Sequence, residues 1–378
     1  MTSAPPTPAA TPHDRLLADF DAGRPAALAR AVSIVENHRH GYDAVLGALH
    51  PRIGRARRIG ITGPPGAGKS TLTTELVKAY RAAGLRVGVV AVDPTSPFTG
   101  GALLGDRIRM EAVALDPGVY IRSLATRGSL GGLSAATREV ADVRDAFGFD
   151  RILIETVGVG QSELDVARTA DTSAVVLVPE SGDSIQTLKA GLMEIADLFV
   201  VNKGDRPGAD RLKTELELML GLRMGATLRN VPAHHGVDLR GLSAAGREEA
   251  RRAMNPARAA REAAHAGGGA ADAGWTPPVE RTVAAKGEGV AEVIDALDRH
   301  FHYLESTGQL RERRRARLRE RVVEAVQQKV QQRLWGDAPT NAWLDGQLAA
   351  LEAGTLTPFA AAEALLAHRG HLVTGETP

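Results

Sequence analysis

The stretch Gly63-Pro64-Pro65-Gly66-Ala67-Gly68-Lys69-Ser70 matches the phosphate-loop pattern G-x-x-x-x-G-K-[ST]. The apolar run 58–62 before it predicts a short buried strand, and apolar residues at helical spacing over 71–83 predict a helix after it. A glycine-rich loop between a strand and a helix can turn successive backbone N–H groups toward one anion, and the helix N-terminus adds its positive dipole end. The stretch therefore predicts a nucleotide-binding P-loop fold, with phosphate contacts running from Gly63 to Thr71.

Two side chains of this loop have chemistry of their own. Lys69 can reach the β- and γ-phosphate oxygens of a nucleoside triphosphate, and the hydroxyl of Ser70 can ligate Mg²⁺. The sequence therefore predicts that Mg²⁺ is bound together with the nucleotide.

A second motif, Asn202-Lys203-Gly204-Asp205, follows the apolar strand predicted over 198–201. This is N-K-x-D at the carboxyl end of a strand, where ligands of open α/β sheets bind. The carboxylate of Asp205 can accept hydrogen bonds from N1–H and the exocyclic N2 amine of guanine, whereas adenine offers no such pair of donors. We therefore expect GTP and GDP as the nucleotides, with Asn202, Lys203 and Asp205 at the base.

A third candidate base element comes after the strand-like segment 279–284. It consists of Ala285 and Lys286. An ordinary loop lysine explains Lys286 equally well, so both interpretations stay open.

Three carboxylates lie between the phosphate loop and the N-K-x-D motif. Asp93 and Glu155 end two apolar strands, and Asp106 lies in the loop after the first of them. Carboxylates at the mouth of the sheet can hold Mg²⁺ or its waters, and turn formation or capping is the alternative, above all for Asp106. The segment Glu155–Gly158 resembles the D-x-x-G element of GTPases with Glu in place of Asp, and Gly158 would let the backbone approach the γ-phosphate. The predicted catalytic set is Lys69, Asp93, Asp106 and Glu155, and the predicted metal set is Ser70, Asp93, Asp106 and Glu155.

These motifs together resemble the MeaB/ArgK family of GTPases, whose human relative is the methylmalonic aciduria type A protein. The similarity covers about residues 25–370, and the run Glu155–Glu163 is nearly diagnostic because simple phosphate-loop proteins do not carry it. The matching segments are 63–71, 92–97, 100–107, 126–132, 155–163, 202–205 and 275–279.

The resemblance implies a GTP-binding and GTP-hydrolysing chaperone of an adenosylcobalamin-dependent acyl-CoA mutase, methylmalonyl-CoA mutase or a close relative. Family members gate cofactor loading and protect or rescue the mutase. The residues matching Lys69, Asp93, Asp106 and Glu155 serve phosphate and metal binding there, and the segment 182–186 with Lys189 is an additional switch.

Val159 stands where a catalytic Gln often follows Gly158. This departure predicts slow hydrolysis until a partner reorders the site.

Composition restricts the class of protein. The chain has 378 residues, a formal net charge of +1 and no cysteine. The near-neutral charge gives no general electrostatic case for binding nucleic acid or a membrane surface, and the missing cysteines exclude disulfides and thiolate metal sites. No apolar run approaches the ~20 residues that span a bilayer. We expect a cytoplasmic protein with neither nucleic acid nor membrane as a partner.

Alternating strand and helix patterns predict an α/β fold with a mostly parallel sheet flanked by helices. The expected order is a disordered tail (1–13), an N-terminal helical extension (14–54), a P-loop GTPase domain (55–305) and a C-terminal helical arm (306–378). The Ala-, Gly- and Arg-rich segment 206–274 has no assigned role.

The arm contains a long predicted helix, 309–335, with an apolar stripe. We predict that this stripe makes the arm a homodimer contact, as in the family that the chain resembles. The basic run 311–321 favours a solvated helix face with i,i+4 charge pairs over a nucleic-acid site. The stripe consists of Leu318, Val322, Val326, Val330 and Leu334.

Three other functions use the same fold. A metallochaperone GTPase of the nickel-delivery kind would carry Cys/His motifs, and this chain has no cysteine. A phosphotransferase (kinase) acting on another partner would transfer phosphate to an acceptor other than water. A non-catalytic interaction module would bind GTP without turning it over.

Overall fold

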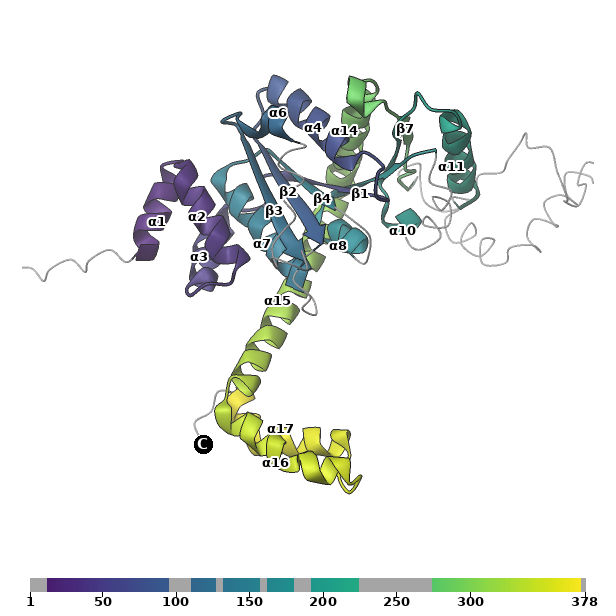
Figure 1. Cartoon of the computed structure of the whole chain (residues 1–378). Coiled ribbons are helices and arrows are strands. Elements are labelled where there is room, and N and C mark those ends of the chain that lie inside the picture. Colours follow the sequence, from purple (N-terminus) through teal and green to yellow (C-terminus); the bar gives the residue numbers. More distant parts are fainter. Residues whose placement is uncertain are drawn as a thin grey trace, which may run out of the picture. The chain divides into compact units, whose positions relative to one another are not determined.

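The computed structural model describes residues 12–94, 110–126, 132–156, 162–179, 192–223 and 274–374 (Figure 1). The chain divides into two compact units, residues 1–306 and 307–378. Most of the predicted tail and of the segment 206–274 lies outside the described residues.

Unit 1 is built on a seven-stranded sheet in which every pairing is parallel. The strand order is β3-β2-β4-β1-β5-β6-β7. Strands of a parallel sheet are covered on both faces, which explains why their sequences are nearly continuous apolar runs. The strands are β1 (Arg57–Thr62), β2 (Val87–Pro94), β3 (Val119–Thr126), β4 (Arg151–Thr156), β5 (Thr172–Leu177), β6 (Leu198–Val201) and β7 (Val279–Arg281).

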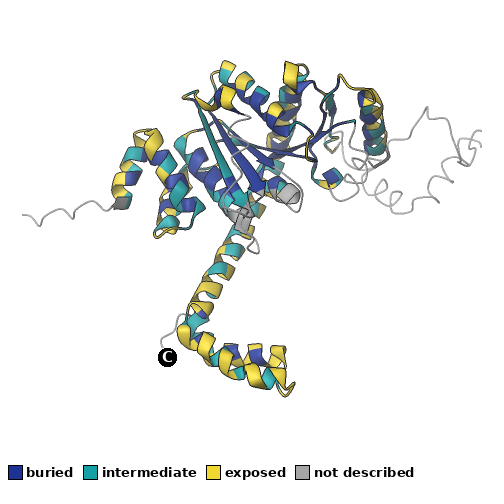
Figure 2. Cartoon of the chain, viewed as in Figure 1, coloured by how far each residue is buried: buried dark blue, intermediate teal, exposed yellow. Residues whose placement is uncertain are grey.

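One face of the sheet is covered by α4 (Lys69–Ala82), the short α6 (Glu111–Ala114) and α14 (Val290–Ser306). Apolar side chains of α4 and α14 share a single buried cluster with alternate residues of the strands. The interior of this cluster is drawn in dark blue in Figure 2.

The other face carries two clusters. The first joins strands β2, β3 and β4 to α7 (Gly132–Phe147), α8 (Ser162–Thr169) and the N-terminal helices. The second joins β5, β6 and β7 to α11 (Ala209–Arg223), close to the short helix α10 (Met193–Ile195).

The N-terminal segment forms three helices and a 3-10 turn. They are α1 (Pro12–Asp21), α2 (Pro25–Glu36), α3 (Tyr42–Leu49) and η1 (His50–Arg52). Leu28, Val32 and Val35 of α2 are buried in the cluster that also contains Val140 of α7. The N-terminal helices therefore share a core with the sheet.

The ends of three strands are set by strand pairing or by a following turn, which the apolar patterns of the sequence do not report. Strand β2 extends to Pro94 because its pairing with β3 continues to the Pro94–Thr126 step. Strand β4 likewise includes Glu155 and Thr156. Strand β7 ends at Arg281, because residues 284–286 turn into the 3-10 helix η4 (Ala284–Lys286).

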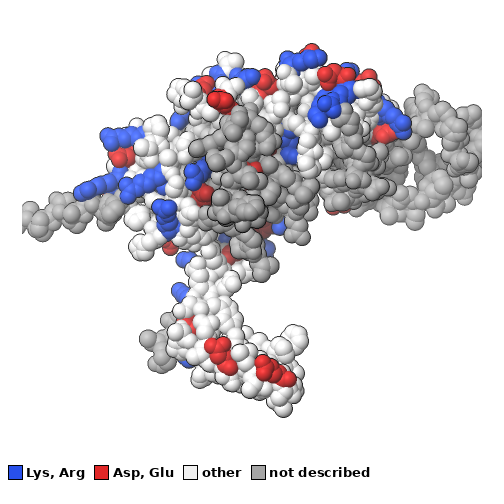
Figure 3. Space-filling model, viewed as in Figure 1, with Lys and Arg blue, Asp and Glu red and all other residues white. Residues whose placement is uncertain are grey.

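Unit 2 consists of α15 (Gln309–Trp335), α16 (Ala338–Glu352) and α17 (Pro358–Thr374). Leu334, Ala361 and Leu365 are buried within it. No helix among the described residues combines the length and the apolar character needed to cross a membrane. On the face drawn in Figure 3, basic and acidic side chains are interspersed, in keeping with the formal net charge of +1.

Candidate functional site

The phosphate loop joins β1 to α4 at the carboxyl edge of the sheet. Gly63 and Gly68 have positive φ angles of 135° and 85°. A Cβ atom at Gly63 would lie 2.1 Å from the carbonyl oxygen of Val176, and one at Gly68 would lie 2.3 Å from the Asn202 side-chain nitrogen. Only glycine combines these backbone angles with such close neighbours.

Lys69 is the first residue of α4 and is almost fully buried. Its Nζ atom donates hydrogen bonds to the carbonyl oxygens of Gly63, at 2.7 Å, and Pro64, at 3.0 Å. The ammonium group is therefore held beside the loop whose backbone would surround a phosphate, close to the helix N-terminus.

Ser70 and the two strand-end carboxylates lie together at the mouth of the sheet. The Ser70 hydroxyl donates to Oε1 of Glu155 at 2.5 Å. Glu155 and Asp93 are 0% and 1% exposed, on the adjacent strands β4 and β2. Carboxylate and hydroxyl oxygens are hard ligands, so this donor set fits Mg²⁺.

Two further predicted residues, Asp106 and Gly158, lie outside the described residues, as do 182–186 and Lys189. In the part of the chain that the structure describes, no three His, Asp or Glu side chains are grouped to hold a metal ion. Of the four predicted metal ligands, the structure describes Ser70, Asp93 and Glu155.

Asn202 connects the phosphate loop to the base motif. Its Nδ2 atom donates to the carbonyl oxygen of Ala67 at 2.8 Å. Its Oδ1 atom accepts from the Thr282 hydroxyl and from the Ala284 backbone N–H, both at 3.1 Å. The contact of this amide with a base stays a prediction, and in the structure the amide binds three loops to one another.

Asp205 and Lys286 lie side by side. Lys286 Nζ is 3.6 Å from Asp205 Oδ2, and both side chains are about half exposed. Lys203, between Asn202 and Asp205 in the motif, has φ 54°, which is uncommon for a residue other than glycine and is found at functional turns. The structure thus places the predicted third base element, in η4, next to the carboxylate predicted to read guanine.

Sequence reasoning missed the partners of this turn. The N–H of Gly204 donates to Thr282 O at 2.8 Å, and the side chain of Arg281 donates to Gly204 O. No sequence signal links residues 77 positions apart. Only the β6–β7 pairing, in which Val201 faces Arg281, brings them together.

Comparisons with known proteins agree with this geometry. The family model described as "Methylmalonyl Co-A mutase-associated GTPase MeaB" matches residues 28–339. A protein of Pyrococcus horikoshii named as a GTPase is 45% identical over 306 residues, which are 81% of this chain and 83% of that protein. The mouse mitochondrial methylmalonic aciduria type A homolog is 33% identical over 318 residues, 80% of this chain and 66% of that one.

A solved structure shows the same fold. The crystal structure of an LAO/AO transport system kinase has a TM-score of 0.59 and 25% sequence identity, covering 93% of this chain and 96% of that one. The match of the family model to most of the chain is decisive. The chain belongs to the MeaB family and is a P-loop GTPase with a parallel seven-stranded sheet.

Proposed function

We propose that this GTPase is a chaperone of an adenosylcobalamin-dependent acyl-CoA mutase, methylmalonyl-CoA mutase or a close relative. It gates cofactor loading and protects or reactivates the mutase. The family description, which names a methylmalonyl-CoA mutase-associated GTPase, supports this partner. The similarity to a protein named for methylmalonic aciduria agrees with it. A cytoplasmic location is part of the proposal.

The observation that carries the proposal is the match of the mutase-associated GTPase family model to residues 28–339. The bonding of Asn202 to both Ala67 and Ala284 supports the nucleotide site that this function needs. These hydrogen bonds join the phosphate loop to the base-reading turns, so the phosphates and the base would be bound by one connected unit.

For hydrolysis we assign roles to the residues of this chain. Lys69 and the 63–71 backbone hold the phosphates. The base is surrounded by Asn202, Lys203, Asp205, Ala285 and Lys286. Ser70, Asp93 and Glu155, with Asp106, would hold Mg²⁺, and the metal ion would supply neutralisation of the phosphate charge. Gly158 lets the backbone approach the γ-phosphate. Water attacks the γ-phosphorus in line, the bond between the γ-phosphorus and the β–γ bridging oxygen breaks, and GDP and inorganic phosphate are released. Positioning and charge do most of the catalysis.

The test is GTP hydrolysis with and without the purified mutase from the same organism. We expect slow turnover alone and an acceleration of about tenfold or more with the mutase, because a partner can order an incomplete site. A Lys69→Ala variant is the control and should lose tight GTP binding. Normal guanine-nucleotide binding with no acceleration by any acyl-CoA mutase of the organism would contradict the chaperone function.

A second candidate is phosphate transfer to an acceptor other than water. It is favoured by the name of the structural neighbour, an LAO/AO transport system kinase. Equal amounts of GDP and inorganic phosphate would exclude it, since a kinase leaves the transferred phosphate on its acceptor.

A further inference from the structure

The turn that carries Asp205 is held by a side chain from the neighbouring strand. Arg281, the last residue of β7, donates from Nη2 and Nε to the carbonyl oxygen of Gly204, at 2.7 and 3.1 Å. The Gly204 N–H donates to Thr282 O at 2.8 Å. Both polar groups of the residue directly before Asp205 are therefore bonded to 281–282.

This arrangement requires glycine at position 204 for reasons of space. A Cβ atom there would lie 2.6 Å from Arg281 Nε, 2.8 Å from Arg281 Cγ and 3.1 Å from Thr282 O. Real Cβ contacts do not come as close as the first two. A side chain at 204 and the guanidinium of Arg281 therefore compete for one volume.

Arg281 is itself oriented from a third element. Its Nη1 atom lies 3.1 Å from Oδ1 of Asp210, in the first turn of α11. The side chain is 45% exposed. Exposed ion pairs contribute little to stability, so losing Arg281 should leave the fold intact while it frees the turn.

We propose that Arg281 is a positioning residue for guanine recognition. Its two hydrogen bonds fix the Gly204 peptide and so the direction of the Asp205 carboxylate. A carboxylate reads N1–H and the N2 amine together only if both oxygens are in line with both donors, and hydrogen bonds weaken steeply when misaligned. The inference rests on the proposed reading of guanine by Asp205.

The first test compares the binding of GTP and inosine triphosphate, which lacks the N2 amine. In Arg281→Ala we expect GTP affinity to fall about tenfold while inosine triphosphate affinity changes by less than about threefold. Arg281→Lys, which keeps one donor, should restore part of the preference. Arg299→Ala is the matched control, because Arg299 makes an exposed ion pair with Glu280 on the same strand and does not bond to Gly204. Equal losses for both nucleotides, or no loss for GTP, would overturn the proposal.

The second test is a double-mutant cycle. Gly204→Ala should weaken the guanine preference in the native background, because the new Cβ displaces Arg281. In Arg281→Ala the same change should have a clearly smaller further effect, since the two closest contacts are gone and only the 3.1 Å approach to Thr282 O remains. Full additivity of the two effects would refute the role of Arg281.

Asp205→Asn separates this inference from the function on which it rests. If Asp205→Asn keeps the guanine preference, the base-reading role of Asp205 fails and the inference fails with it. If Asp205→Asn loses the preference while Arg281→Ala keeps it, only the inference is wrong.

Discussion

Arg144 has the largest fully buried side chain among the described residues. None of its guanidinium nitrogens has a hydrogen-bond partner. Its Cζ atom lies 5.2 Å from the ring centroid of Tyr120, and its Cδ atom lies 3.0 Å from where a Cβ at Gly88 would be. A nearby acid, Glu36, is bonded to Arg122 instead. The guanidinium of Arg144 therefore packs against the Tyr120 ring, and its side chain occupies the space left by the missing side chain of Gly88.

The cost of this burial should be measurable. Burial lowers the pKa of the Arg144 guanidinium to about 9, well below the ordinary value of arginine. Because the folded-state pKa is the lower one, the unfolded chain binds more protons between the two values. The penalty is thus fully present below about pH 9 and decreases as the pH rises above it toward the ordinary pKa of arginine.

Arg144→Met should therefore raise the free energy of unfolding at pH 7 by about 1–4 kcal/mol, because it replaces an unpaired buried charge by an apolar chain of similar length. Urea unfolding with an unchanged m-value measures this. Arg86→Met is the control, since Arg86 stacks on Phe147 and Phe149 and is only partly buried. A less stable Arg144→Met variant would show that the cation contributes more than its burial costs.

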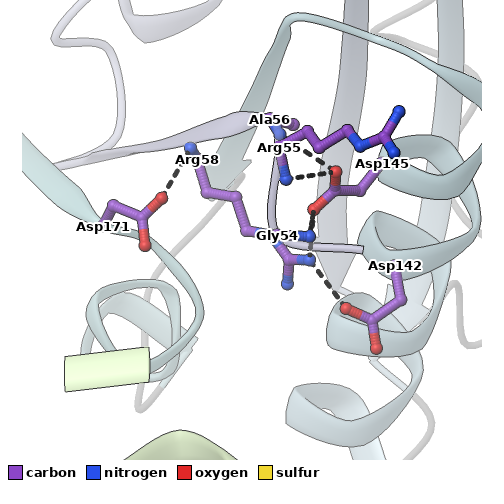
Figure 4. A network of polar contacts seen from close by, with 7 residues as sticks. All are labelled: Gly54, Arg55, Ala56, Arg58, Asp142, Asp145 and Asp171. Carbon is purple, nitrogen blue, oxygen red and sulfur yellow. Dashed lines mark hydrogen bonds and ion pairs between the residues drawn. The ribbon is translucent and has the colours of Figure 1, made fainter. Parts of the chain in front are cut away.

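At the scale of elements, Asp145 connects α7 to the start of β1 (Figure 4). Its carboxylate accepts hydrogen bonds from the backbone N–H groups of Gly54, Arg55 and Ala56, at 2.7, 3.0 and 2.9 Å. It also lies 3.1 Å from the guanidinium of Arg58. An acid in the last turn of a helix opposes the helix dipole, so its position is explained by these partners.

The acids around Arg58 act together. Burial alone would lower the pKa of Arg58, but the charges of Asp142, Asp145 and Asp171 raise it above its ordinary value. The network thereby fixes the first residues of the strand that ends in the phosphate loop.

Asp145→Ala should lower the free energy of unfolding by about 3–5 kcal/mol, because it leaves three backbone donors and part of a buried charge without a partner. Asp150→Ala is the matched control. This variant removes one exposed carboxylate that accepts a hydrogen bond from the Arg86 N–H. It should lower the free energy of unfolding by only about 1 kcal/mol. Equal losses in the two variants, measured by thermal and urea unfolding, would refute the special role of Asp145.

The sequence was sufficient for the elements whose signal is local. The apolar runs before the phosphate loop and before Asn202 predicted β1 and β6. The glycines of the loop predicted a tight turn, and their positive φ angles explain why glycine is needed there. The ends of β2 and β4 were set by pairing with neighbouring strands, which no local pattern reports. Helix α16 was not predicted as a separate element, although its N-cap Asp337 and the Pro339 of its first turn are helix-start signals.

In the candidate site, residue types were predictable and bonding partners were not. The presence of Asn202, Asp205 and Lys286 at one place follows from their positions after parallel strands. The bonds of Asn202 to Ala67, and of Arg281 to Gly204, depend on the register of strands distant in sequence. Such long-range contacts become visible only in the folded chain.

At the scale of the whole molecule, unit 2 has an apolar face on α15. Leu318, Val322 and Val326 are 44%, 64% and 54% exposed, whereas Leu334, further along the same stripe, is buried. Burying an aliphatic side chain fully is worth about 1.5–3 kcal/mol. The open part of the stripe is thus a favourable contact for a second copy, and we propose the 306–378 arm as the homodimer contact.

The double variant Val322→Glu/Val326→Glu should convert the dimer to a monomer, because dimer formation would then bury two charges on each chain. Sedimentation velocity at micromolar concentration measures the state, and circular dichroism checks that helix content is unchanged. Gln327→Glu/Gln331→Glu adds the same charges at the same spacing on exposed positions beside the stripe and should stay dimeric. A dimer that persists in the valine variant, or a monomeric native protein, would contradict the assignment. If the valine variant is monomeric and keeps native GTP binding, the arm sets assembly while the nucleotide site is complete within one chain.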